Sequence, residues 1–89
     1  MQHNEKWRLQ DLLGKAILNN RHQLLGHIVD VEIVPDDGRI NFVELQIDDA
    51  KPARSVFVPW TQISVDIAGS KLTAPFGLRF LRSISQPRD

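Results

Sequence analysis

Alternation of apolar and polar residues is clearest in two neighbouring segments of the 89-residue chain, residues 26–34 and 40–48. A period of two residues is that of a strand with one face turned toward a core. The pattern therefore predicts two long strands. One face of the first strand holds Val29, Val31 and Ile33, and one face of the second holds Asn41, Val43, Leu45 and Ile47.

The stretch between these strands, Val-Pro-Asp-Asp-Gly-Arg at residues 34–39, predicts a tight and exposed hairpin turn. Short Asp side chains bond locally to the backbone of such turns, and Gly38 supplies a positive φ. Adjacent carboxylates in an exposed turn stay solvated, whereas acid–base catalysis needs a shielded pair. Asp36 and Asp37 are therefore interpreted as turn residues.

The register of the hairpin depends on the length of its loop. A three-residue loop of residues 36–38 pairs Val31 with Val43 and Val29 with Leu45. A four-residue loop beginning at Pro35 sets polar residues of one strand opposite apolar residues of the other. We prefer the shorter loop because it keeps one face apolar, although it makes Asp30 and Glu44 neighbours on the outer face.

Shorter elements are predicted on both sides of the hairpin. Residues 5–13 have a loosely helical spacing that ends at Gly14, and further strands are expected at residues 15–18, 54–60, 62–67 and 71–74. This succession predicts an all-β fold, a small antiparallel β-barrel of five to six strands. We divide the chain into an N-terminal extension (1–8), the barrel domain (9–74) and a C-terminal tail (75–89) that packs on the barrel or on a partner, with its last five residues frayed.

Composition narrows the class of protein. Hydrophobic residues make up 42% of the chain, enough for one core, and no cysteine is present. The formal net charge is zero, which gives no strong signal for nucleic-acid binding. Residues 1–48 carry a charge of −3 and residues 49–89 a charge of +3. No segment resembles a signal peptide or a membrane span, so we expect a cytoplasmic protein without membrane insertion.

No motif for catalysis or for phosphate binding occurs in the chain. Its three histidines, His3, His22 and His27, are not spaced so as to converge on a metal. We therefore predict a non-enzymatic protein with no catalytic residues, no metal site and no cofactor.

Two groups of residues are candidates for contact with a partner. On the outer face of the hairpin, Val34, Ile40 and Phe42 form an apolar patch that a monomer leaves wet. In the tail, aromatic rings alternate with cations at Phe76, Arg79, Phe80 and Arg82. Two alternatives stay open: the tail covers its own barrel or meets a partner, and Trp60 either plugs the barrel mouth or contacts a partner.

Three segments together, "LLGKAI", "LLGHIVDVEIVPDDGRINFVELQI" and "RSVFVPWTQISVD", resemble the PRC-barrel family over about residues 9–74. The residues that carry the likeness are Gly14, Gly26, Asp37, Gly38, Arg39, Pro59 and Trp60. His22 stands where the family commonly has a turn glycine, and histidine tolerates the left-handed conformation better than most residues. The loop "DAKPA" (49–53) also departs from the glycine-rich loop common in the family.

The resemblance implies a binding or assembly module rather than an enzyme. We expect a protein partner of unknown identity, with homodimerisation as the first expectation. One alternative, which the basic tail suggests, is an accessory factor for RNA or ribosome maturation. A second is an accessory subunit of a photosynthetic or membrane-associated complex. Both follow from functions found in the family.

Overall fold

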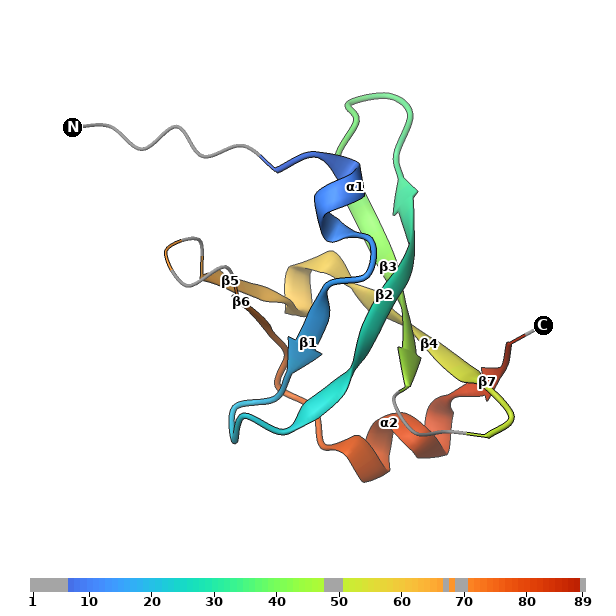
Figure 1. Ribbon diagram of the computed structural model, residues 1–89. Helices are drawn as coiled ribbons and strands as arrows, with labels where there is room; N and C mark the ends of the chain where they lie inside the picture. Colours follow the sequence, from blue (N-terminus) through green and yellow to red (C-terminus); the bar gives the residue numbers. More distant parts are fainter. Residues whose placement is uncertain (1–6, 48–50, 67, 69–70, 89) are drawn as a thin grey trace.

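The computed structural model describes residues 7–47, 51–66, 68 and 71–88. The described residues form one sheet with the strand order β5-β6-β1-β2-β3-β4-β7 and two short α-helices beside it (Figure 1). The elements are α1 (Leu9–Leu12), β1 (Ala16–Leu18), β2 (Leu24–Ile33), β3 (Ile40–Ile47), β4 (Arg54–Pro59), the 3₁₀ helix η1 (Trp60–Gln62), β5 (Ser64–Asp66), β6 (Lys71–Thr73), α2 (Leu78–Ile84) and β7 (Gln86–Pro87).

The predominance of β-structure is confirmed, but the prediction of a five- to six-stranded antiparallel barrel is wrong in two respects. The sheet has seven strands, and no pairing among the described residues joins its outer strands β5 and β7. It is also mixed, because β1 and β6 pair in parallel, with Ile17 opposite Leu72. Each of these strands takes its direction from its own antiparallel neighbour, β2 or β5, so their mutual orientation is not a local choice.

The hairpin loop is the four-residue alternative that we did not prefer. The Val34 N–H donates to the Arg39 carbonyl (2.9 Å), and the Gly38 N–H donates to the Val34 carbonyl (2.8 Å). Gly38 has φ +74°, as predicted for the left-handed position. Residues 35–38 therefore form the loop, and register must be restored elsewhere in the hairpin.

Two β-bulges restore the register. Beyond the loop Ile33 lies opposite Ile40, but the pairing shifts by one residue at Asn41, so that Val31 faces Val43 as predicted. A second shift at Val29 places Ile28 opposite Leu45, and the predicted pair Val29–Leu45 is wrong. Periodicity alone did not reveal this shift, because both residues are apolar. The shift leaves Ile28 fully buried and Val29 only half-buried.

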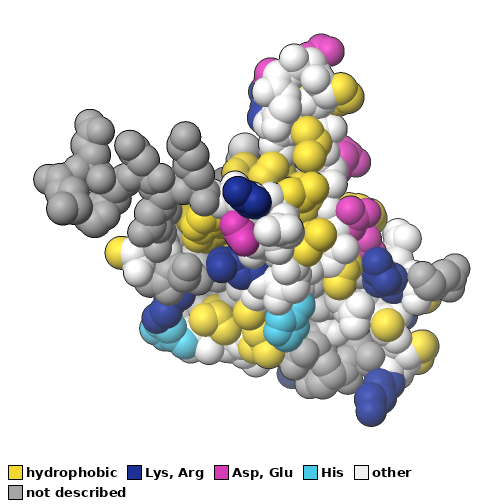
Figure 2. Space-filling model, turned by 45° about the horizontal axis from the view of Figure 1, so that its top comes forward, with side chains coloured by type: hydrophobic (Ala, Val, Ile, Leu, Met, Phe, Trp, Pro, Cys, Tyr) yellow, Lys and Arg dark blue, Asp and Glu magenta, His cyan; other side chains and the backbone are white. Residues whose placement is uncertain are grey.

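Beyond the core, the β2–β3 hairpin continues as an arm that ends in the exposed loop of residues 35–38 (Figure 1). Figure 2 shows apolar side chains along this arm, with acidic side chains beside them and at its tip. The acidic residues of the arm are Asp30, Glu32, Asp36 and Asp37, all exposed. The arm thus adds surface to a small protein without adding to its core.

The turn between β1 and β2 contains a non-glycine residue in the left-handed conformation, at the position that the family resemblance indicated. His22 has φ +63° between β1 and β2, the left-handed region that disfavours residues with a Cβ. The Asn19 side-chain oxygen accepts hydrogen bonds from the backbone N–H groups of Arg21 and Gln23, both at 2.9 Å. The buried Asn19 amide therefore holds the strained turn in place.

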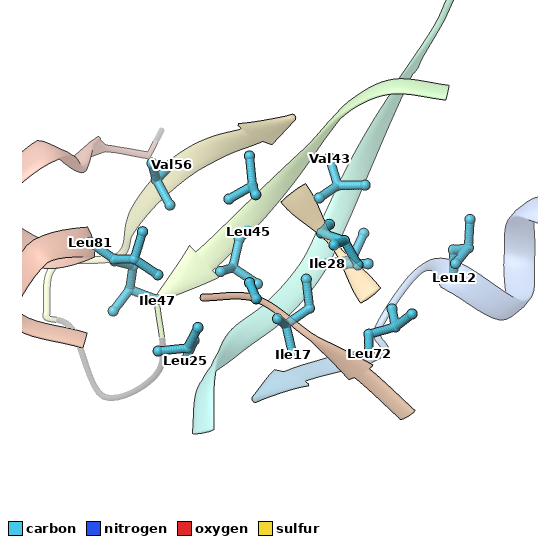
Figure 3. Packing of buried hydrophobic residues seen from close by; sticks show 13 residues of the cluster. Leu12, Ile17, Leu25, Ile28, Val43, Leu45, Ile47, Val56, Leu72 and Leu81 are labelled. Carbon is cyan, nitrogen blue, oxygen red and sulfur yellow. The ribbon is translucent and has the colours of Figure 1, made fainter. Parts of the chain in front are cut away.

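The hydrophobic core lies against the concave side of the curved sheet. In Figure 3, Leu12 of α1 and Leu81 of α2 lie at opposite ends of the cluster, with side chains of β1, β2, β3, β4 and β6 between them. The buried apolar residues are Leu12, Ile17, Leu25, Ile28, Val43, Leu45, Ile47, Val56, Val58, Ile63, Leu72, Ala74 and Leu81. Trp60 is half-buried and packs against this cluster.

The tail is ordered, and the expectation of a frayed end is wrong for residues 85–88. Helix α2 packs against β2 and β4, and β7 pairs with the start of β4. Arg54 of β4 donates hydrogen bonds to the side-chain and backbone oxygens of Ser85. The Arg88 N–H donates to the Ala53 carbonyl (2.9 Å). These bonds fix the tail to the sheet.

We predict that Gly26→Ala destabilises the protein strongly. An added Cβ would lie 2.2 Å from the backbone oxygen of Gln46, in the paired strand β3, which cannot move without breaking the sheet. Urea denaturation should show a free energy of unfolding lower by about 3 kcal/mol. Gly77→Ala is the matched control, since nothing lies within 4 Å of its added Cβ. Its cost should stay below about 1 kcal/mol, and equal losses would contradict this account.

Candidate protein-binding surface

Large apolar side chains that remain exposed identify the first candidate surface. Scattered exposed side chains are normal, so the informative feature is a group of neighbours. Phe57 is 61% exposed, Phe80 51% and Ile84 48%. The other large apolar residues exposed in the described part of the chain are Leu9, Leu13, Ile33 and Val65.

Helix α2 divides its residues between the core and the solvent. Leu81 is 1% exposed in the core, and Leu78, three residues earlier, packs against the core. Phe80 and Ile84, four residues apart, lie on another side of the helix, where side chains at this spacing are neighbours. The ring of Phe80 stacks on that of Phe76, with centroids 6.0 Å apart. The helix therefore covers the core with one face and shows a second apolar face outward.

Phe57 continues this face onto the sheet. It stands on the outer side of β4, between the buried residues Val56 and Val58, which point into the core. Phe57 and Ile84 line one groove of about 650 Å³. Phe57, Phe80 and Ile84 together are called the α2–β4 surface below.

The polar side chains of the groove are engaged with one another. The Glu44 carboxylate accepts a hydrogen bond from the Ser55 hydroxyl (2.7 Å) and pairs with Arg88 (3.0 Å). Glu44 and Arg88 are the only ionisable residues among the groove's lining residues, which also include Gln86 and Pro87. The groove is therefore electrically balanced and partly apolar, which suits a neutral partner.

The candidate residues of the hairpin are not equivalent. Ile40 is half-buried and packs against the core, because the bulge at Asn41 turns it from the outer face that we expected. Val34 and Phe42 are half-buried without being part of the core packing. Phe42 lies opposite Pro59 of β4 and Glu32 of β2. A hairpin contact surface therefore consists of Val34 and Phe42, flanked by acids.

The candidate residues of the tail all lie on or next to α2. Arg79 and Arg82 are exposed, as is Phe80, whereas Phe76 is half-buried and packs against the core. Phe76 also lines a second, smaller groove of about 340 Å³ with residues of the His22 turn, among them Asn19, Asn20, Arg21 and Gln23. The polar groups of Asn19 are already used in holding that turn.

Sequence reasoning missed Phe57 and Ile84. The alternation of residues 54–60 signals that Phe57 points away from its buried neighbours, so its exposure was available from the sequence. Ile84 gave no such signal, because the tail had not been predicted as a helix. Phe57 and Ile84 line the same groove only because the tail folds back onto β4.

The residues that carry the family resemblance lie in turns, at a close contact between strands and at the end of a strand. Gly14 and Gly38 have positive φ, and Gly26 lies against Gln46. Arg39 donates its backbone N–H to the Asp37 carboxylate, and Pro59 and Trp60 form the passage from β4 into η1. The residues that carry the family resemblance therefore fix turns, a close strand contact and the end of β4.

A search of the described residues finds no group of three or more His, Asp or Glu side chains placed to hold a metal ion. No described helix is long and apolar enough to cross a membrane.

The family follows from comparison of the sequence with known domains. The model of the PRC-barrel domain matches residues 5–77. The chain belongs to the PRC-barrel family. The resemblance seen in the glycines, the Asp-Gly-Arg turn and the Pro-Trp pair is thereby confirmed. No curated protein matches the chain.

A solved structure shows a similar fold. It is that of a 16S ribosomal RNA processing protein, RimM, from Pseudomonas aeruginosa, with 18% sequence identity and a TM-score of 0.57. The similarity covers 83% of this PRC-barrel chain but 46% of that protein. The chain therefore spans about half the length of its structural neighbour, and the likeness concerns the fold.

We predict that the two faces of α2 contribute very differently to stability. Leu81→Ala removes a side chain from the core and should lower the free energy of unfolding by about 2–5 kcal/mol. Phe80→Ala, at the neighbouring and exposed position, should cost less than about 1 kcal/mol. Urea denaturation followed by circular dichroism measures both. Comparable costs would mean that α2 does not pack as described.

Proposed function

We propose that this PRC-barrel protein is a non-enzymatic protein-binding or assembly module that uses the α2–β4 surface. The observation that carries the proposal is the grouping of three large apolar side chains on the outside of a protein whose core is already well filled. Exposed apolar groups of this kind gain free energy when a partner covers them.

The polar residues beside this surface support binding rather than catalysis. Glu44 is held by Ser55 and Arg88, and Arg54 is held by Ser85, so these groups fasten the tail to the sheet. A carboxylate engaged in this way is positioned to order the surface. Apolar side chains on an ordered scaffold bind with little loss of conformational freedom.

A matched pair of variants tests the binding role. We expect Phe80→Glu to abolish capture of the natural partner in an affinity pull-down from the native cell, because it places a charge in an apolar contact. Leu9→Glu is the control, since Leu9 is similarly exposed (47%) but lies on α1, away from α2 (Figure 1). Capture that is unaffected by Phe80→Glu would contradict the proposal.

Self-association through the hairpin is the second part of the proposal. Val34 and Phe42 are half-buried apolar residues of the arm that the core does not use, and Glu32 and Asp30 lie beside them. Two copies meeting here bring like charges together, and salt screens such repulsion. A dimer at this surface should therefore be stabilised by salt.

We expect sedimentation at high micromolar concentration to show a dimer that Phe42→Glu weakens at least about tenfold, a loss of about 1.4 kcal/mol. Raising the salt concentration should strengthen wild-type association. A wild-type monomer at these concentrations would contradict the homodimer, while leaving the α2–β4 proposal standing.

A role in ribosome or RNA maturation is the alternative function. It is supported by the fold shared with the RimM structure and by the exposed Arg79 and Arg82 near the stacked rings of Phe76 and Phe80. Surfaces that bind single-stranded RNA combine basic side chains with aromatic rings on which bases stack, and Phe80 is an exposed ring of this kind.

For this alternative we expect filter-retained binding of single-stranded RNA that falls steeply as salt is raised and is reduced by the double variant Arg79→Gln, Arg82→Gln. The matched control is Arg39→Gln together with Lys71→Gln, which removes the same charge from the exposed hairpin tip and from β6. Absence of retention at low salt would exclude the RNA role.

A further inference from the structure

We infer that the α2–β4 surface takes an extended apolar segment of a partner protein, which adds to the edge of β4 at Phe57 through backbone hydrogen bonds. The inference rests on the proposed function, because it specifies the form in which that partner binds. It is drawn from the backbone of β4 rather than from exposed side chains alone.

The pairing of β4 is complete on one side and incomplete on the other. Along β3, each of the residues Ser55 to Pro59 has a partner. On the opposite side, β7 pairs with Arg54 and Ser55, and the pairing stops there. Continuing the same register would bring Ile84 opposite Phe57, but Ile84 is the last residue of helix α2. The pairing thus ends two residues before it would cover Phe57.

Alternation along the strand shows where the Phe57 backbone points. The Ala53 carbonyl accepts a hydrogen bond from the Arg88 N–H, so the backbone groups of Ala53 face the β7 side. Backbone groups of every second residue in an antiparallel strand point to the same side, which assigns those of Ser55 and Phe57 to this edge. Within the described residues, neither β7 nor a backbone hydrogen bond from a turn or loop engages Phe57. Its N–H and C=O are therefore open to an added strand.

The groove beside this edge has the shape and chemistry for such a strand. It is lined by backbone or side chains of Val56, Phe57 and Ile84 and has a volume of about 650 Å³. A residue placed opposite Phe57 lies beside its ring, in the groove that Ile84 also lines. Because the Glu44–Arg88 pair leaves the groove without net charge, it favours apolar side chains over phosphates or charged segments.

The outer edges of the sheet are less suited to this role. Pro87 of β7 pairs with Arg54 in the position that turns its own backbone outward, and proline has no N–H to donate there. Strand β5 ends in the charged Asp66, and charges on an edge oppose strand addition. Among the described strands, the opening at Phe57 combines free backbone groups with a groove.

A second copy of the chain is a poor occupant of this opening. An incoming strand fits opposite residues 57–59 and then meets Gln86, which occupies the place opposite Ser55. Strand β4 of another copy carries its own β7 and would bring it into this obstacle. The free end or an exposed extended segment of a different protein avoids the clash.

Hydrogen exchange tests the opening in the free protein. We expect the Phe57 amide to exchange about a hundredfold faster than the amides of Val56 and Val58. The backbone groups of these two residues point to the opposite side of β4 from those of Phe57 and therefore face β3. Amide-resolved NMR measures these rates on the wild-type chain. A Phe57 amide as slow as that of Val58 would overturn the inference, whatever binds.

Peptides selected from a displayed library of random linear dodecamers test the occupant. We expect enriched peptides with alternating apolar residues, and we expect their binding to slow exchange at the Phe57 amide. Phe57→Ala and Phe57→Pro both remove the ring, but Pro also removes the open N–H. Phe57→Pro should therefore bind these peptides at least about tenfold more weakly than Phe57→Ala.

Several results would overturn the inference: a library without binders, binders that leave the Phe57 amide fast, or equal affinity of the two variants. Protection of Phe57 by raised protein concentration alone would show that a second copy is the occupant. If partner capture still depends on Phe80 while the two Phe57 variants capture alike, the proposed function survives and strand addition fails. Circular dichroism checks that both variants fold, and the wild-type exchange rates decide the opening if Phe57→Pro does not.

Discussion

The pairing of β2 with β3 is the constraint on which the rest of the structure depends. Strand β2 pairs with β1 on one side and with β3 on the other, and β3 in turn holds β4. Gly26 allows the Gln46 carbonyl to approach the β2 backbone where this pairing begins. The two bulges then let one ten-residue strand serve the core near its start and form a projecting arm near its end.

Folding of the tail onto the sheet creates the surface where function is proposed. Leu81 fills one end of the core and Leu78 packs against it, so these two leucines anchor α2. Arg54 and Ser85, with Glu44 and Arg88, then fix the chain on both sides of β7. Because β7 is only two residues long, this attachment leaves Phe57 at an open edge beside Ile84. The attachment of the tail therefore both stabilises this side of the sheet and leaves Phe57 exposed.

The two candidate surfaces differ in their electrostatics. The arm carries acids with few compensating cations in contact, and Arg39 at its tip pairs with Asp37 at 3.6 Å between two exposed side chains. An exposed pair of this kind contributes little to stability. In the groove, by contrast, the carboxylate of Glu44 is mostly buried and bonded to two partners. The arm thus presents charge to the solvent, and the groove presents apolar and backbone groups.

The sequence by itself determined the long strands and the glycine turn at Gly38, because these depend on local periodicity and on backbone conformation. Its resemblance to the family also pointed to the left-handed turn at His22. It also predicted Val31 opposite Val43. Only the tertiary structure decided the loop length and the bulges, since Ile28 and Val29 are interchangeable by hydrophobicity and differ only in what they pack against. The parallel pairing of β1 with β6, the order of the tail and the meeting of Phe57 with Ile84 were decided there too. Each joins residues distant along the chain, and no local pattern encodes such a contact.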